Sequence, residues 1–112
     1  MVIRYANEKV EKYFSDWGVM KKKLPADWVR AIKKHIDRLV AADTFGEFAS
    51  LGLGHLEALK GKNSGKYSVR VNGNVRMVLE PIHIDERIEL SVEIVVEGVV
   101  DYHGGKDNWF IS

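Results

Sequence analysis

The stretch from Tyr67 to Leu79, YSVRVNGNVRMVL, decides the fold. Apolar and polar residues alternate on both sides of Asn-Gly-Asn, which is typical of two antiparallel strands joined by a tight turn. A three-residue loop keeps the apolar residues on one face, whereas a two-residue loop would mix the faces. The pattern therefore predicts a hairpin with these opposing pairs: Val71 with Val75, Arg70 with Arg76, and Val69 with Met77.

This register sets two arginines, Arg70 and Arg76, directly opposite each other on the exposed face of the hairpin. Like charges in that position repel each other unless an anion lies between them. The guanidinium fork matches the geometry of phosphate. We therefore interpret this face as a phosphate-binding surface; the alternative is that both side chains extend into water.

The loop before the hairpin adds further positive charge. It carries Lys60, Lys62 and Lys66 between glycines, without the Gly-Lys-Ser/Thr ending of a nucleotide-binding P-loop. We expect these lysines to contact backbone phosphates. The net charge of +1 hides this block, because five basic residues and no acidic one lie in 58–79, and seven acidic residues lie in 80–101 against one arginine.

The regions around the hairpin predict an α+β fold in which two N-terminal helices pack on one face of a twisted antiparallel sheet. Before the hairpin we expect a short strand in 2–6, a helix from an Asn7 cap to Gly18, a helix from Pro25 to near Asp43, and one more helical turn in 44–51. After it we expect a strand from Ile88 to Val96, a bulge or turn at Gly98, and a closing strand from Val99 to His103.

Composition narrows the classes of function. A chain of 112 residues has room for one modest core. The absence of cysteine excludes disulfides, thiolate metal sites and cysteine nucleophiles. Residues 1–4 run directly into a polar helical pattern, so we expect no signal peptide, no membrane segment and a cytoplasmic location.

Asp101-Tyr102-His103 forms the end of the last predicted strand. Histidine titrates near neutral pH, so His103 is a candidate for proton transfer. Asp101 would orient its imidazole or take part in the proton transfer. A metal held by the four residues His55, Glu57, His83 and His103 is not expected, because no two of the histidines have ligand spacing.

Four segments in this order resemble the killer-protein toxins, the HigB-type members of the RelE/ParE superfamily. They are Leu56-Glu57-Ala58-Leu59-Lys60-Gly61, Tyr67-Ser68-Val69-Arg70-Val71-Asn72, Asn74-Val75-Arg76-Met77 and Asp101-Tyr102-His103. The resemblance implies a toxin domain over 1–103, with 104–112 as a tail past the usual family end. It also implies a toxin of a type II toxin–antitoxin system that cleaves messenger RNA on the ribosome without a metal or cofactor, and a helix-turn-helix antitoxin that neutralises it.

Carried over by position, the resemblance assigns catalytic or substrate-positioning roles to five residues: Glu57, Lys60, Arg76, Asp101 and His103. Arg70, Lys62, Lys66 and Tyr102 are the expected RNA contacts. The chain departs from the family in a longer interval between Arg76 and Asp101 and in the tail after His103. Two alternatives therefore stay open: a non-catalytic ParE-like toxin acting on DNA gyrase, and an inactive or regulatory relative.

Overall fold

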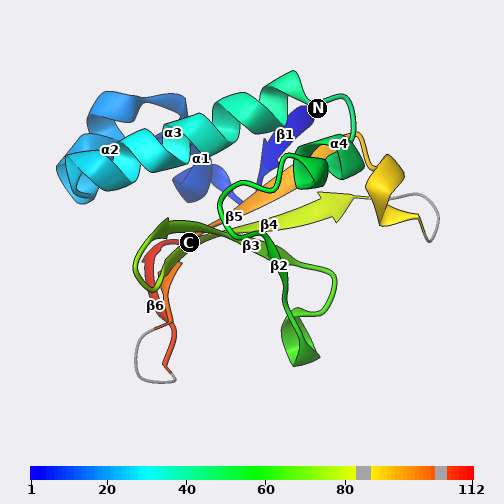
Figure 1. Cartoon of the computed structure of the whole chain (residues 1–112). Helices are drawn as coiled ribbons and strands as arrows, with labels where there is room; N and C mark the ends of the chain where they lie inside the picture. The colour runs from blue at the N-terminus through cyan, green and yellow to red at the C-terminus, as the bar shows by residue number, and fades with distance from the viewer. Residues whose placement is uncertain (83–86, 103–105) are drawn as a thin grey trace.

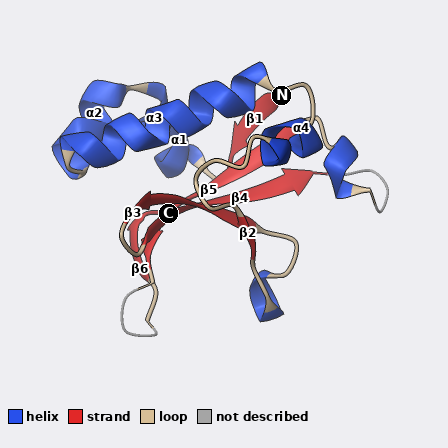
Figure 2. Cartoon of the chain, in the orientation of Figure 1, coloured by secondary structure: helices blue, strands red, loops and turns tan. Residues whose placement is uncertain are grey.

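The computed structural model describes residues 1–82, 87–102 and 106–112. The helices gather on one side of a single six-stranded sheet (Figures 1 and 2), which confirms the α+β class. The helices are α1 (Glu8–Ser15), α2 (Trp17–Lys23), α3 (Ala26–Ala41) and α4 (Phe45–Ser50), with short 3-10 turns η1 (Gly61–Asn63) and η2 (Ile88–Leu90). The strands are β1 (Val2–Tyr5), β2 (Glu57–Ala58), β3 (Tyr67–Asn72), β4 (Val75–Ile82), β5 (Glu93–Asp101) and β6 (Asn108–Ile111).

Three helices, α1 to α3, form where the sequence predicted two. Asn7 caps α1 as expected, but α1 ends at Ser15, and Gly18 lies inside α2 rather than ending a helix. The cause is Asp16, whose carboxylate accepts hydrogen bonds from the backbone N–H groups of Gly18 and Val19 at 2.9 and 3.3 Å. An aspartate in this position starts a new helix by satisfying its first free donors.

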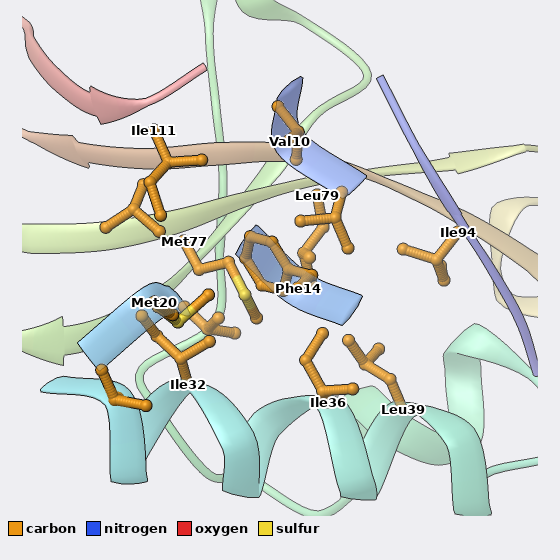
Figure 3. Packing of buried hydrophobic residues seen from close by; sticks show 14 of the residues in the cluster. Val10, Phe14, Met20, Ile32, Ile36, Leu39, Met77, Leu79, Ile94 and Ile111 are labelled. Atoms are coloured by element: carbon orange, nitrogen blue, oxygen red, sulfur yellow. The ribbon is translucent and has the colours of Figure 1, made fainter. Parts of the chain in front are cut away.

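The long helix α3 begins directly after Pro25, and the predicted extra turn is α4, capped by the Thr44 hydroxyl. The apolar stripe of α3 faces the sheet, as Figure 3 shows for Ile32, Ile36 and Leu39. Met77 and Leu79 of β4 point toward this stripe from the sheet. The core therefore lies between α3 and the centre of the sheet, and the helices leave the opposite face of the sheet uncovered (Figure 1).

The sheet is mixed rather than purely antiparallel. Its order is β1-β5-β4-β3-β2, and β1 runs parallel to β5. This corrects the prediction of an antiparallel sheet. The parallel pairing is possible because the whole helical region and the hairpin separate β1 from β5 along the chain.

The β3–β4 hairpin confirms the central feature of the predicted register. Arg70 lies opposite Arg76, and their neighbours Val69 and Met77 also pair. The predicted pairing of Val71 with Val75 is wrong. Val75 lies opposite Asn72, so the turn contains two residues. Val71 has no opposing residue on β4 and forms a bulge in β3. This bulge keeps the faces from mixing, which is the effect expected of the three-residue loop.

The predicted strand from Ile88 to Val96 is wrong in its first half. Residues 88–90 form the turn η2, and β5 starts at Glu93. The backbone N–H of Phe45 donates a hydrogen bond of 2.8 Å to the Ser91 carbonyl, which ties this segment to α4 instead of the sheet. Val92, an apolar residue of the predicted strand, is 55% exposed.

The bulge expected at Gly98 is present, and β5 continues through it to Asp101. The strand expected from Val99 to His103 is therefore the second half of β5; His83 and His103 both lie outside the described residues. Beyond this region, β6 pairs with the second half of β5, and Ile111 is fully buried in the core. The edge of β5 thus carries β1 over 93–96 and β6 over 99–101.

Candidate functional site

The candidate site is centred on Arg70 and Arg76, on the face of the sheet away from the helices. The residues before and after them in the ladder, Val69 and Met77, are fully buried against the helical layer. Because successive side chains of a strand point to opposite faces, both arginines project from the other side. The like-charged pair predicted from the sequence is therefore present.

The backbone of Arg70 is held from both sides at the edge of β3. Among the described residues, no strand pairs with this edge beyond Ser68, and the backbone groups of Arg70 form hydrogen bonds with other elements. Its N–H donates to the Gly54 carbonyl at 2.6 Å, and its carbonyl accepts a hydrogen bond of 2.8 Å from the Nε2 atom of His35. Gly54 is packed so closely on the imidazole that an added Cβ would lie 2.6 Å from the ring.

Sequence reasoning missed the role of His35. It lies on the apolar stripe of α3, is 5% exposed, and has no hydrogen-bond partner for Nδ1 in the described structure. Burial lowers its pKa; the bond to the Arg70 carbonyl acts against this shift, and the charge of Arg38 adds to it. A histidine within an apolar helical stripe was the available signal, but its partner depends on how α3 crosses β3.

Arg76 is fixed by the turn of its own hairpin. Its Nη1 group donates to the carbonyls of Gly73 and Val75 at 2.5 and 3.2 Å. Within the described residues neither Arg76 nor Arg70 forms an ion pair with a carboxylate; the ion pairs there join Arg4 to Glu93 and Lys66 to Glu97. The positive charge of the two arginines is therefore not neutralised within the described part of the site.

Glu57 shares the face of the two arginines. It lies opposite Ser68, two residues before Arg70 on β3, so its side chain is on the same side of the sheet. Lys60 precedes η1 and Lys62 lies within it, and both are exposed. This turn projects from the sheet on the side away from the helices (Figure 1).

Lys66 differs from the other lysines. Its Nζ lies 3.5 Å from a carboxylate oxygen of Glu97, and the two side chains are only 29% and 19% exposed. Pairing with Glu97 brings the basic hairpin into contact with the acidic block of the sequence. The positive charge of Lys66 is thus partly neutralised by Glu97.

Asp101 and Tyr102, the described residues of the Asp101-Tyr102-His103 segment, lie differently with respect to Arg76. Arg76 lies opposite Val100, and Asp101 lies opposite the buried Val75, so the ladder sets Asp101 on the other face from Arg76. Burial raises the pKa of the Tyr102 phenol, Asp107 raises it further, and Arg76 acts in the opposite direction. Of the two described residues of this segment, Tyr102 is therefore the one near Arg76.

No three His, Asp or Glu side chains in 1–82, 87–102 and 106–112 gather where they could hold a metal ion. No helix in those ranges has the length and apolar character needed to cross a membrane.

Comparison with known proteins agrees with this architecture. A toxin from Agrobacterium tumefaciens described as YoeB/ParE superimposes with a TM-score of 0.59 and 19% identity, covering 88% of this chain and 96% of that one. A YoeB-YefM complex from Staphylococcus aureus gives a TM-score of 0.57 and 21% identity over 92% of this chain and 97% of that one. Among curated proteins, none matches the sequence.

The family is shown by the sequence itself. A family model described as the RelE-like toxin of the type II toxin–antitoxin system HigB matches residues 3–103. The match covers nearly all of the sheet and every helix, and ends before β6. The chain belongs to the HigB-like family of RelE-like toxins of type II toxin–antitoxin systems.

Proposed function

We propose that this toxin is an endoribonuclease that cleaves messenger RNA on the ribosome. The observation that carries the proposal is the pair Arg70 and Arg76, held opposite each other without a carboxylate partner among the described residues. Such a pair is electrostatically unfavourable in the free protein, and a phosphate between the two side chains would relieve the repulsion.

The chemistry requires few groups. The 2′-hydroxyl of one nucleotide attacks the adjacent phosphorus, the bond to the 5′-oxygen of the next nucleotide breaks, and the products are a 2′,3′-cyclic phosphate and a 5′-hydroxyl. A base must accept the proton of the 2′-hydroxyl, an acid must protonate the leaving oxygen, and cations must stabilise the charged phosphorane. We assign this stabilisation to Arg76, with Arg70 and Lys60.

The proton transfers are assigned to Glu57 and His103. Glu57 is a carboxylate on the arginine face, and His103 offers an imidazole, a group that can accept or donate a proton. Asp101 lies opposite Val75 on the other face, so we assign it to positioning the segment that leads to His103. Tyr102, Lys62 and Lys66 are proposed contacts to the RNA.

The partner is proposed to be an antitoxin that covers the arginine face. One of the similar solved structures is described as a YoeB-YefM complex. A basic surface of this kind is best covered by an acidic segment, because complementary charge gives both specificity and rapid association. We expect a helix-turn-helix antitoxin encoded beside this gene.

Expression in a bacterial host tests the proposal. Wild-type protein should arrest growth and create new 5′ ends within reading frames, mapped by primer extension. Arg76→Ala should remove both effects, while Arg30→Ala on the exposed surface of α3 should retain them. DNA breaks with intact messages would instead support a toxin acting on DNA gyrase, and normal growth with soluble wild-type protein would support an inactive relative.

A further inference from the structure

The strand β6 brings an additional residue to the candidate site. It lies beyond the part of the chain that the family model matches, and it pairs with β5 so that Asn108 is opposite Asp101 and Trp109 is opposite Val100. Val100 is in turn opposite Arg76, and Arg76 opposite Arg70. One row of the sheet therefore runs across four strands as Arg70, Arg76, Val100 and Trp109.

The two aromatic residues of β6 face different surroundings. Phe110 packs edge-on against Trp28 of α3, with ring centroids 5.3 Å apart, and so anchors the strand to the helical layer. Trp109 shares the face of the arginines because directly opposed residues of antiparallel strands point the same way. It is 43% exposed, so its ring is accessible to a ligand on this face.

The residue in the middle of this row, Val100, is inaccessible to water. Val100 is fully buried although it lies on the face away from the helices. Its neighbours in the row are Arg76 and Trp109, whose long side chains flank it on either side. At about 4.8 Å per strand, the backbones of Arg76 and Trp109 are roughly 10 Å apart, a distance that their side chains span.

A basic group beside an exposed indole is the combination that binds single-stranded nucleic acid. Cationic side chains hold the phosphates, and an aromatic ring stacks on a base whatever its identity. We propose that Trp109 is the platform on which one base of single-stranded RNA stacks while Arg70 and Arg76 hold its phosphate. The inference rests on RNA being the substrate of the proposed function, but it concerns binding and is measured without cleavage.

Tryptophan fluorescence gives a direct test. A short single-stranded RNA with 2′-deoxy substitutions, which cannot react, is titrated into the full chain, alongside the same oligonucleotide lacking bases. We expect the RNA to quench the fluorescence of the wild-type protein and the abasic strand to quench it far less. The quenching should disappear in Trp109→Phe and persist in Trp17→Phe, whose ring packs against Phe14 in the helical layer.

Affinity provides the second readout. Trp109→Ala should weaken RNA binding roughly 5- to 150-fold, the range for one stacked base, while Trp109→Phe, which keeps a flat ring, should stay near wild type. Circular dichroism and urea unfolding of both variants separate lost stacking from lost folding. Equal RNA affinity in wild type and a folded Trp109→Ala would overturn the proposal. It would also be overturned if the abasic strand quenched the fluorescence of the wild-type protein as strongly as the RNA does.

Two further outcomes separate this inference from the function on which it rests. Stacking without cleavage of messages would contradict the endoribonuclease and leave the base platform in place. If Trp109→Ala binds RNA normally and cleaves messages but no longer binds the protein encoded beside this gene, Trp109 serves a protein interface and the proposal is wrong.

Discussion

Arg70 and Arg76 lie directly opposite each other on β3 and β4, on the face of the sheet that the helices leave uncovered. Each is held by backbone contacts: Arg70 by Gly54 and His35, and Arg76 by the carbonyls of its own turn. The molecule therefore maintains a repulsive pair at a defined position. This relationship connects stability and function, because the repulsion that destabilises the free protein would favour an anionic ligand.

Removing one charge of the pair should stabilise the protein. Arg70→Gln should raise the free energy of unfolding by roughly 0.2–1 kcal/mol at low salt, the scale of a cross-strand pair, while reducing cleavage. Urea unfolding at low and high salt measures the gain, which should shrink as salt screens the repulsion. Arg30→Gln removes the same charge from an exposed position on α3 and should leave stability nearly unchanged. A loss of stability in Arg70→Gln would contradict the repulsive pair.

Arg76 should act through its planar fork as well as its charge. Arg76→Ala should reduce the cleavage rate roughly 100- to 1000-fold, as expected for the loss of one transition-state donor. Arg76→Lys keeps the charge but loses the bidentate geometry, so it should recover only part of the rate. Single-turnover cleavage on programmed ribosomes measures both variants, and full activity in Arg76→Lys would argue against phosphate recognition by the fork.

The Gly98 bulge should be essential for the β6 strand. Gly98 has φ +149°, and a Cβ there would lie 2.0 Å from the Ile111 carbonyl oxygen. Gly98→Ala should cost more than the roughly 1–3 kcal/mol of a strained backbone position and expose the tail to protease. Gly65→Ala is the matched control, because Gly65 also has positive φ but open space around it. Equal losses in the two variants would mean that β6 does not press on Gly98.

The buried histidine makes stability depend on pH. Because burial lowers the pKa of His35 in the folded state, the unfolded chain binds a proton first as pH falls below the ordinary value of 6.5. Stability should therefore decrease as pH falls from about 6.5 through the lower folded pKa, and the effect should be absent above pH 7. His35→Gln, which removes the titration, should flatten this slope in urea unfolding, whereas His55→Asn at an exposed position should not.

The two loop lysines should behave differently. Lys62 is exposed on η1, whereas Lys66 is half-buried against Glu97. Lys62→Ala should weaken RNA binding and reduce its salt dependence without affecting stability. Lys66→Ala should destabilise the protein, because it leaves Glu97 without its partner. Fluorescence anisotropy at two salt concentrations, together with urea unfolding, distinguishes the roles; a stability loss in Lys62→Ala alone would reverse the assignment.

The hairpin could be predicted from sequence because alternation specifies which residues share a face. The pairing of Arg70 with Arg76 followed from that pattern, even though the hairpin has a two-residue turn and a bulge at Val71 instead of a three-residue loop. The bulge at Gly98 followed from a glycine inside a strand pattern. These features depend on neighbouring residues, which a single sequence displays.

The remaining features depend on residues far apart in the chain. The parallel pairing of β1 with β5 has no local signature, because a four-residue strand does not specify its partner. Ile88–Leu90 alternates like a strand, but contacts with α4 turn it away from the sheet. The same limit applies to His35, whose partner is the Arg70 carbonyl 35 residues later, and to Trp109, whose place beside Arg76 depends on the pairing of β6.

Cleavage of a defined message by purified protein on translating ribosomes tests the central claim most directly. We expect new 5′-hydroxyl and 2′,3′-cyclic phosphate ends in the message with wild-type protein, no cleavage where the attacking nucleotide is 2′-deoxy, and cleavage roughly 100- to 1000-fold slower with Arg76→Ala. Intact messages with folded wild-type protein, or cleavage that persists at the 2′-deoxy position, would contradict it.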